Sequence, residues 1–312
     1  MGTEVSFVGL DQAAAFLVEH LGRDVGEVEL VGEGAWSRCF GFVDEGRPLV
    51  ARFGRHVDDF VKDRRAATFA APGLPVPHVV EIGPAFDGWF AISTRAFGDP
   101  LEARAADEWP AVLPAIVAAL DGIRTIDVTG TTGFGGWDAE GRGTFPTWRD
   151  FLLAVDTDEP ARRTHGWRRK LVDSPVGDGP FRAGLARLRT VVDSAEGVRA
   201  VAHRDLLNRN VLVADDRVTA VFDWGCSVYG DFLYDLAWFV FWAPWHAGLE
   251  ALDLGPTVLR HLAETGVAVP DADARLRGCL LHIGLDHQAY CAWTGDHDDL
   301  IRITAQTNAL LD

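Results

Sequence analysis

The chain contains the stretch His203-Arg204-Asp205-Leu206-Leu207-Asn208-Arg209-Asn210, and the pair Asp223-Trp224 follows thirteen residues after its end. An aspartate and an asparagine five residues apart, with a second aspartate beyond an apolar segment, is how phosphotransferases place a base and a metal site beside a nucleotide's γ-phosphate. Segments 211–213 and 218–222 are apolar and are separated by a polar turn, which predicts two short strands. The polar residues therefore lie on a loop and at a strand end, where catalytic residues are usually found.

Three polar residues of these two motifs suit parts of metal-assisted phosphoryl transfer, and a fourth suits a supporting role. Asp205 is the candidate base that orients the acceptor hydroxyl and takes its proton. Asn210 and Asp223 offer an amide oxygen and a carboxylate, which are suitable ligands for Mg²⁺. We count His203 with Asp205 as catalytic and expect it to brace the loop through hydrogen bonds. Any one of these residues alone would be an ordinary loop residue, so the interpretation depends on their order and spacing.

Composition indicates a globular protein with a core in each of two lobes. The chain has 312 residues, of which 48% are apolar and 24% charged. Its four cysteines show no metal-binding spacing, and we expect them to be reduced. The start of the chain lacks a signal-peptide pattern, and the most apolar stretch, 236–245, is interrupted by Pro244 and too short for a bilayer. We expect a cytoplasmic monomer without membrane contact.

The charge balance is strongly acidic. There are 29 basic and 46 acidic side chains, which give a net charge of −17. This argues against nucleic acid as a partner, because phosphate binding requires basic surface. An acidic cleft would favour a cationic small molecule. The same charge can serve solubility alone, so it permits a cationic substrate without identifying one.

Hydrophobic periodicity divides the chain into two regions. Residues 1–96 contain a predicted helix at 11–21, then three strands, a helix at about 57–70 and two further strands. In residues 97–312 helical periodicity dominates, at 109–126, 148–155, 181–192, 234–241, 276–293 and 300–311. We therefore predict an α+β, two-lobed protein-kinase-like fold. Residues 1–96 would form a small antiparallel-sheet lobe that binds nucleotide, and residues 97–312 a larger, mainly helical lobe for catalysis and substrate.

A third motif identifies a family. The segment Gly230-Asp231-Phe232-Leu233-Tyr234-Asp235-Leu236-Ala237 follows Asp223-Trp224, and together with the loop 203–210 it resembles the aminoglycoside phosphotransferase family. The resemblance implies Mg²⁺-dependent transfer of the γ-phosphate of ATP or GTP to a hydroxyl of a cationic aminoglycoside. It also implies that Asp231 and Asp235 support the loop and cap the next helix.

Longer stretches narrow this resemblance to the hygromycin B phosphotransferases within the family. They are Phe60-Val61-Lys62-Asp63-Arg64, Leu74-Pro75-Val76-Pro77, Thr132-Gly133-Phe134-Gly135, Thr147-Trp148-Arg149-Asp150-Phe151, Phe241-Trp242-Ala243-Pro244-Trp245 and Ile283-Gly284-Leu285-Asp286. Hygromycin B is therefore the expected acceptor, and antibiotic resistance the expected role.

The nucleotide site is predicted from weaker signals. Gly32 and Gly34, followed by Ser37, lie between two predicted strands, where backbone N–H groups can approach phosphates, although a plain hairpin turn has the same appearance. Arg52 stands where protein kinases carry a phosphate-binding lysine, and the fork of arginine can also clamp phosphate. Its expected partner is Asp63, one methylene shorter than the usual glutamate.

Lys62 competes with Arg52 as a phosphate ligand. Residues 92–96, with Ser93 and Ala96, are expected to form the hinge that binds the purine through backbone groups.

The acceptor site is the least defined. Asp286 lies within an apolar helical segment, where a carboxylate requires a partner or a ligand. It is a candidate substrate contact together with Asp205. Trp238 follows the metal-site segment and is a candidate wall of the acceptor pocket, although core packing explains a tryptophan equally well.

One other function remains open on sequence grounds, and two more are disfavoured. The same fold can act on a different small alcohol, such as a macrolide, a sugar or a choline-like metabolite, because fold does not determine substrate. A catalytically inactive nucleotide-binding scaffold would lack Asp205, Asn210 or Asp223, and all three are present. A protein kinase is disfavoured, since no long activation segment separates Asp223-Trp224 from Gly230.

Overall fold

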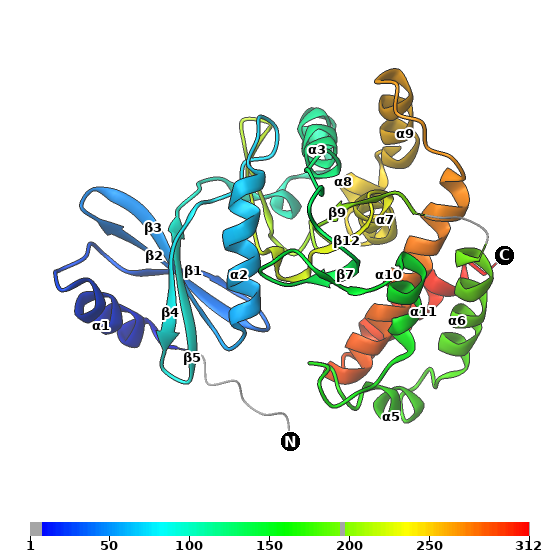
Figure 1. Ribbon diagram of the computed structural model, residues 1–312, viewed down its shortest axis with the longest axis horizontal. Helices are drawn as coiled ribbons and strands as arrows, with labels where there is room; N and C mark the ends of the chain where they lie inside the picture. The colour runs from blue at the N-terminus through cyan, green and yellow to red at the C-terminus, as the bar shows by residue number, and fades with distance from the viewer. Residues whose placement is uncertain (1–7, 194–196, 312) are drawn as a thin grey trace. The chain divides into compact units, whose positions relative to one another are not determined.

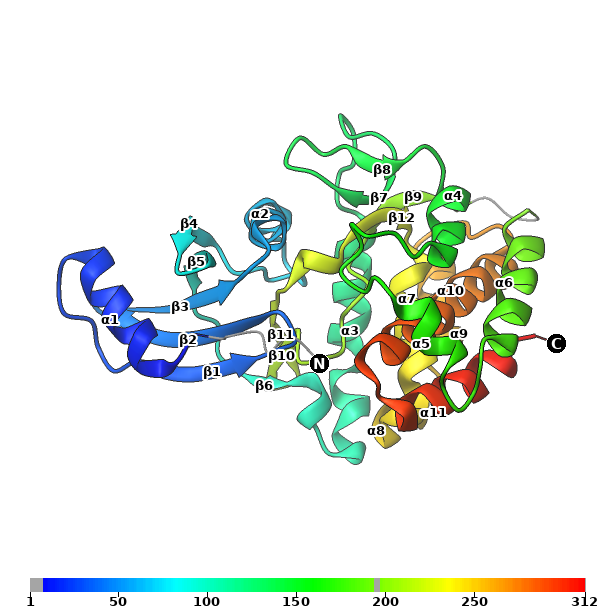
Figure 2. The same cartoon turned by 90° about the horizontal axis from the view of Figure 1, so that it is seen from below.

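The computed structural model describes residues 8–193 and 197–311, which form two compact units (Figures 1 and 2). The first unit comprises the chain to Ala103 and the segment Asn208–Cys226. The second comprises Arg104–Leu207 and the chain from Ser227 onward. The units are discontinuous in sequence, a feature that the predicted division after residue 96 did not include.

The first unit is built on a five-stranded antiparallel sheet in the order β1-β2-β3-β5-β4. Its elements are α1 (Leu10–Leu21), β1 (Glu29–Glu33), β2 (Ser37–Asp44), β3 (Arg47–Gly54), α2 (Val57–Ala66), β4 (Val79–Ala85) and β5 (Gly88–Thr94). Short 3₁₀ turns follow at Ala67–Phe69 and Leu101–Ala103. The predicted order of three strands, a helix and two strands is confirmed.

Successive side chains of each strand point to opposite faces of this sheet, and a different helix covers each face. On one face, Phe53 of β3 packs in a core with Leu17 of α1. On the other, Ala91 of β5 packs with Phe60 of α2. Arg52 is paired with Ala91 across the strands and its guanidinium lies over the Phe60 ring, so it occupies the face covered by α2.

A second, three-stranded sheet completes the first unit. Strands β10 (Val211–Ala214) and β11 (Arg217–Val221) form the predicted hairpin, and β6 (Asp99–Pro100) pairs with β10. A short 3₁₀ turn, η5 (Trp224–Cys226), follows β11. The turn residues Asp215 and Asp216 have positive φ angles of 47° and 58°, which aspartate tolerates better than most residues. Because Val211 pairs with Val221, the start of β10 and the end of β11 lie side by side.

The second unit is mainly helical (Figure 2). Its helices are α3 (Trp109–Arg124), α4 (Trp148–Leu153), α5 (Trp167–Val172), α6 (Gly179–Val192), α7 (Leu233–Trp242), α8 (Ala247–Glu250), α9 (Leu254–Glu264), α10 (Ala272–Thr294) and α11 (His297–Asn308). A four-stranded sheet has the order β8 (Gly143–Phe145), β7 (Phe134–Trp137), β12 (Val228–Asp231) and β9 (Arg199–Ala202).

Helix α10 is the packing centre of this unit, because α5, α6, α7 and α11 all contact it. The six predicted helical regions are confirmed, with ends shifted by a few residues. The short strands β7 and β8 and the helices α5, α8 and α9 were not predicted, since each is too short or too mixed in composition to show a clear period. Within the described ranges, no helix is long and apolar enough to cross a membrane.

We predict that Gly284→Ala in α10 destabilises the fold. An added Cβ would lie 2.2 Å from Oγ1 of the buried Thr307 of α11, whose hydroxyl donates to the Ile303 carbonyl. The overpacking should outweigh alanine's helix preference and lower the free energy of unfolding by about 1–2 kcal/mol. The control is Gly278→Ala in the same helix, where the nearest atom is 3.6 Å away. In urea denaturation, Gly284→Ala should have a lower free energy of unfolding than this control. The reverse order would contradict the packing argument.

Candidate active site

In the first unit, Arg52 is the centre of the candidate nucleotide site. Its guanidinium donates to Ser37 Oγ at 2.8 Å, to Asp63 Oδ2 at 2.9 Å and to Asp223 Oδ1 at 2.9 Å. Strand pairing explains the first contact, since β2 and β3 are neighbours, and α2 supplies Asp63 from above the same face. The expected partnership of Arg52 with Asp63 is present in spite of the shorter side chain.

Helix α2 also holds the segment that carries Asp223. Asp63 Oδ1 accepts a hydrogen bond from the Trp224 backbone N–H at 2.7 Å. Lys62 Nζ donates to the Gly225 carbonyl at 2.8 Å. Lys62 therefore contacts the turn after Asp223, and the carboxylate of Asp63 joins that turn to Arg52.

The electrostatics of this trio favour a cation. Burial opposes the charge on Arg52, but Asp223 and then Asp63 raise its pKa well above the ordinary value. Burial raises the pKa of Asp63, an effect to which Asp223 adds and which Arg52 opposes. One guanidinium shared between two carboxylates leaves one excess negative charge in the trio. Such a site suits a divalent cation that arrives with nucleotide phosphates.

The two predicted metal ligands lie at the same end of the β10–β11 hairpin. Asn210 precedes β10, and its carbonyl accepts a hydrogen bond from the Phe222 N–H at 3.1 Å, next to Asp223. The Asp223 carboxylate is 37% exposed, and its one hydrogen-bonded oxygen among the described residues is Oδ1, which leaves Oδ2 for a ligand. A carboxylate and an amide are hard oxygen donors, so these residues fit Mg²⁺.

Backbone strain marks this segment. Asn208, Arg209 and Asp223 all have positive φ, at 74°, 67° and 61°. Such conformations cost about 1–3 kcal/mol each in non-glycine residues and are concentrated at functional sites. The Arg209 N–H donates to Glu102 at 2.6 Å, which helps to hold the loop in this form.

The glycine segment is a turn between β1 and β2. The Gly34 N–H donates to the Ser37 carbonyl at 2.9 Å, and Gly32 lies at an irregularity of the strand pairing. A side chain at Gly34 would meet nothing within 4 Å. The segment thus has the form of a hairpin turn, which sequence analysis gave as the alternative, and its contact with phosphates stays a prediction.

The predicted hinge follows the last strand of the sheet. Ser93 lies in β5, paired with Val50, and Ala96 lies two residues beyond the end of that strand. The Arg95 N–H donates to the Pro48 carbonyl at 3.1 Å, so the hinge backbone is fixed to β3. Purine binding by Ser93 and Ala96 stays a prediction.

In the second unit, the candidate base lies on a loop held by α7. The Asp235 carboxylate accepts hydrogen bonds from the backbone N–H groups of His203 and Arg204, both at 2.8 Å. Burial raises the pKa of Asp235 to about 6, although these two N–H donors oppose the shift. His203 is fully buried, and the Asp205 N–H reaches its Nδ1 at 3.3 Å. His203 thus braces the loop, and Asp205 is half-buried.

The predicted substrate contacts lie in two different environments of the same unit. Both carboxylate oxygens of Asp286 carry ion pairs, to Arg162 at 3.0 Å and to Arg204 at 3.2 Å. Trp238 is 3% exposed and packs edge-on against His287, with ring centroids 5.2 Å apart. Their contact with substrate stays a prediction.

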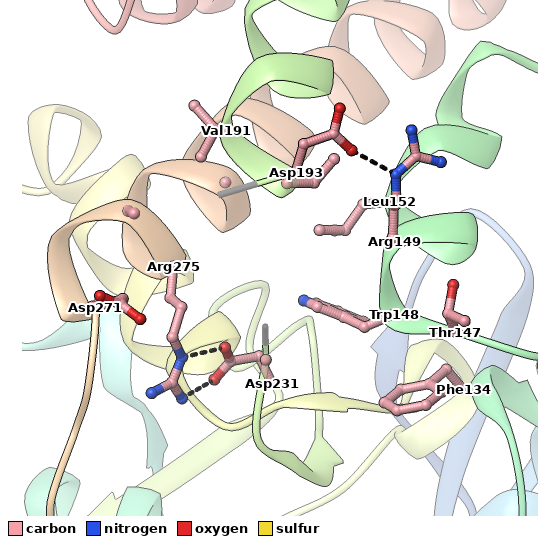
Figure 3. Close-up of a pocket in the computed structure, with 14 residues that line it drawn as sticks. Phe134, Thr147, Trp148, Arg149, Leu152, Val191, Asp193, Asp231, Asp271 and Arg275 are labelled. Atoms are coloured by element: carbon pink, nitrogen blue, oxygen red, sulfur yellow. Dashed lines mark hydrogen bonds and ion pairs between the residues drawn. The ribbon is translucent and has the colours of Figure 1, made fainter. Parts of the chain in front are cut away.

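A pocket of about 730 Å³ lies elsewhere in the second unit, between α4, α6 and α10 (Figure 3). Its floor holds the buried ion pair of Asp231 with Arg275, and Asp231 also accepts from the Leu233 N–H at the start of α7. Asp231 and Asp235 therefore have the structural roles that the family resemblance implied. The lining of this pocket, as far as the structure describes it, contains none of the predicted site residues.

Several site contacts were missed from the sequence. Arg162 is 124 residues from Asp286, and nothing in the sequence signals that the two pair. The contact of Lys62 with the Gly225 carbonyl was also missed, because backbone acceptors carry no sequence signature. The ion pair of Arg204 with Asp286 was missed as well, and the only hint of it was that Arg204 directly precedes Asp205 in the motif.

Comparisons with known proteins show the family to which the chain belongs. The model of the phosphotransferase enzyme family matches residues 27–262. The hygromycin-B 4-O-kinase of Escherichia coli is 33% identical, over 95% of this chain and 83% of that protein. The crystal structure of aminoglycoside phosphotransferase APH(4)-Ia has a TM-score of 0.83 and 32% identity, over 96% of this chain and 97% of that one.

Two further solved structures extend the comparison. A thermostable mutant of APH(4)-Ia in ternary complex with AMP-PNP and hygromycin B superposes with a TM-score of 0.82 at 32% identity, covering 96% of this chain and 97% of that one. An aminoglycoside-3′-phosphotransferase of type VIII has a TM-score of 0.58 at 21% identity, covering 88% and 97%, which shows the fold alone. The predicted kinase-like fold and family resemblance are confirmed.

We predict that Arg52→Lys weakens use of the nucleotide. A lysine keeps the charge but cannot hold Ser37, Asp63 and Asp223 in one planar fork. By analogy with residues that orient metal ligands, kcat/KM for the nucleotide should fall about 10–100-fold. The measurement is steady-state kinetics at saturating acceptor.

The matched control for this substitution is Arg55→Lys. Arg55 pairs with Asp87 in an exposed ion pair of the same unit, worth about 0–1 kcal/mol. It should leave the kinetics unchanged. Wild-type kinetics in Arg52→Lys would show that the three contacts do not position the site.

Proposed function

Because the chain belongs to the phosphotransferase enzyme family, we propose that it phosphorylates a hydroxyl of an aminoglycoside, with hygromycin B as the acceptor. The observation that carries this proposal is 33% identity over 95% of the chain to a hygromycin-B 4-O-kinase. The proposed acceptor group is accordingly the 4-hydroxyl, and the proposed role is antibiotic resistance.

The proposed phosphate donor is ATP. One mutant of the structural relative APH(4)-Ia was crystallised with AMP-PNP, an ATP analogue, and another mutant of the same protein with ADP. In this chain Asn210 and Asp223 would hold Mg²⁺, which when bound neutralises charge on the nucleotide phosphates. Arg52 would keep the Asp223 carboxylate in place, since it already donates to Oδ1 at 2.9 Å. GTP is the alternative donor.

Asp205 is the proposed base. Its carboxylate accepts the proton of the acceptor hydroxyl as that oxygen bonds to the γ-phosphorus and the bond from phosphorus to the bridging oxygen breaks. His203 does not exchange protons in this scheme. Its Nδ1 accepts the Asp205 N–H at 3.3 Å and so fixes the backbone that carries the base.

We further propose a setting for this activity. The enzyme would act in the cytoplasm as a monomer, on a nucleoside triphosphate and a cationic small molecule, without binding nucleic acid. The net charge of −17 supports this, since it favours cations over polyanions.

The decisive test is phosphorylation of hygromycin B and its dependence on Asp205. Wild-type protein should release ADP in the presence of hygromycin B and yield a product one phosphate heavier, with NMR locating the phosphate on the 4-hydroxyl. Asp205→Asn should lower kcat about 10²–10⁴-fold, because the base is lost while the shape is kept. Asp215→Asn, an exposed turn residue whose φ of 47° asparagine also adopts, is the control.

A panel of other acceptors shows which result would contradict the proposed substrate. It should include other aminoglycosides, a macrolide, a simple sugar and choline. Turnover with one of the last three and none with any aminoglycoside would overturn the proposed substrate class. Full activity of Asp205→Asn would overturn the assignment of the base.

We also predict a strict requirement for a divalent cation. Removal of Mg²⁺ with EDTA should abolish turnover, and added Mg²⁺ should restore it. Asp223→Asn should require at least about 10-fold more Mg²⁺ for half-maximal rate, since a neutral amide binds the cation more weakly than a carboxylate. A titration of rate against Mg²⁺ measures this, with Asp215→Asn again as control. Undiminished turnover in EDTA would exclude the metal role of Asn210 and Asp223.

A further inference from the structure

A partly buried charge cluster adjoins the proposed base, and α10 supplies its carboxylate. Asp286 accepts from the guanidinium of Arg162 at 3.0 Å and from that of Arg204 at 3.2 Å, one on each carboxylate oxygen. Arg162 is itself fixed, because it donates to the Thr157 carbonyl at 2.7 Å. The side chains are 15–28% exposed, so the cluster is mostly shielded from water.

Arg204, the residue before Asp205, is held by contacts of both its side chain and its backbone. Its guanidinium lies over the rings of Phe151 and Tyr234, at 5.1 and 5.2 Å from their centroids. Its backbone N–H donates to Asp235 at 2.8 Å. Its φ is 68°, a left-handed conformation that a non-glycine residue keeps only when its surroundings impose it.

This conformation sets the direction in which the chain enters Asp205. If Arg204 relaxed to an ordinary φ, the next residue would turn with it and its carboxylate would point elsewhere. A misplacement of about 1 Å in a reacting group can cost about 10²-fold in rate. The contacts that hold Arg204 are therefore contacts on which the reaction depends.

From this geometry we infer that Asp286 is a positioning residue, whose carboxylate fixes Arg204 and thereby the orientation of Asp205. The inference rests on the proposed function, in which Asp205 is the base. This positioning role is different from direct binding of the acceptor by Asp286. Two guanidinium groups and one carboxylate carry a net positive charge, which disfavours a cationic ligand at this point.

The charge state of Asp286 is consistent with such a role. Burial alone would raise its pKa, but Arg204, then His282 and Arg162, lower it to about 2. The carboxylate is thus ionised at every pH at which the enzyme would be assayed. The pairing with Arg204 does not switch off as the pH changes.

The test compares Asp286→Ala, Asp286→Asn and Asp286→Glu with wild type and with Asp273→Ala, an exposed aspartate of the same helix. We expect Asp286→Ala to lower kcat about 10–100-fold with the KM for hygromycin B changed less than about threefold. Asp286→Glu should recover part of kcat, because it retains the charge. Asp273→Ala should match wild type.

Hydrogen exchange provides a readout that does not depend on the acceptor. Peptides that cover residues 203–207 should exchange faster in Asp286→Ala than in wild type, while peptides from α11 should not change. If Asp286→Ala fails to fold, as judged by its melting curve, Asp286→Asn gives the same comparison with less change in volume.

Two outcomes would overturn the inference. A rise in KM for hygromycin B with kcat unchanged would make Asp286 an acceptor contact. Unchanged exchange of residues 203–207 in both neutral variants would show that the loop does not depend on it. If the wild-type protein phosphorylates no aminoglycoside, the proposed function fails, but the exchange comparison still decides whether Asp286 holds the loop.

Discussion

The shared guanidinium of Arg52 is the interaction on which the site in the first unit depends. One planar group joins a strand neighbour, Ser37, a helix carboxylate, Asp63, and the candidate metal ligand, Asp223. A lysine could not do this, because its ammonium is a single point of charge. Protein kinases usually have a lysine at this place. Here Arg52 joins Asp63 of α2 to Asp223, the candidate metal ligand. Asp63 is one methylene shorter than glutamate, and the longer reach of arginine compensates for it.

The stretch 203–210 is fixed at both ends by different parts of the protein. At its start, Asp235 of the second unit holds the N–H groups of His203 and Arg204. At its end, the β10–β11 hairpin of the first unit holds Asn210 through the Phe222 N–H. The spacing of five residues between Asp205 and Asn210 thus connects two ends that are anchored independently. The candidate base and the candidate metal ligand are therefore each held by contacts within their own unit.

Prediction from sequence succeeded where a pattern was repeated or a motif was dense. The alternation in β2, β3 and β5 and the spacing from Asp205 to Asp223 are local properties, so the sheet and the hairpin could be predicted. The short strands β7 and β8 could not, since four and three residues contain too few repeats to show a period. Long-range pairs such as Arg162 with Asp286 were also inaccessible, because a charge in the sequence does not reveal its partner. The roles of Asp231 and Asp235 followed from the family resemblance and not from the residues alone.

The acidic composition does not reveal which carboxylates are open to a ligand, because several of them have partners within the protein. A net charge of −17 invites the expectation that carboxylates near Asp205 are available to a cationic substrate. Three carboxylates of the second unit are engaged internally instead: Asp231 with Arg275, Asp235 with two backbone N–H groups, and Asp286 with two arginines. The pair of Asp231 with Arg275 is fully buried, and loss of one partner of such a pair costs about 3–5 kcal/mol. These three carboxylates are therefore less available to a ligand than their number in the sequence suggests. Net charge alone therefore cannot tell a carboxylate that binds a ligand from one that stabilises the fold.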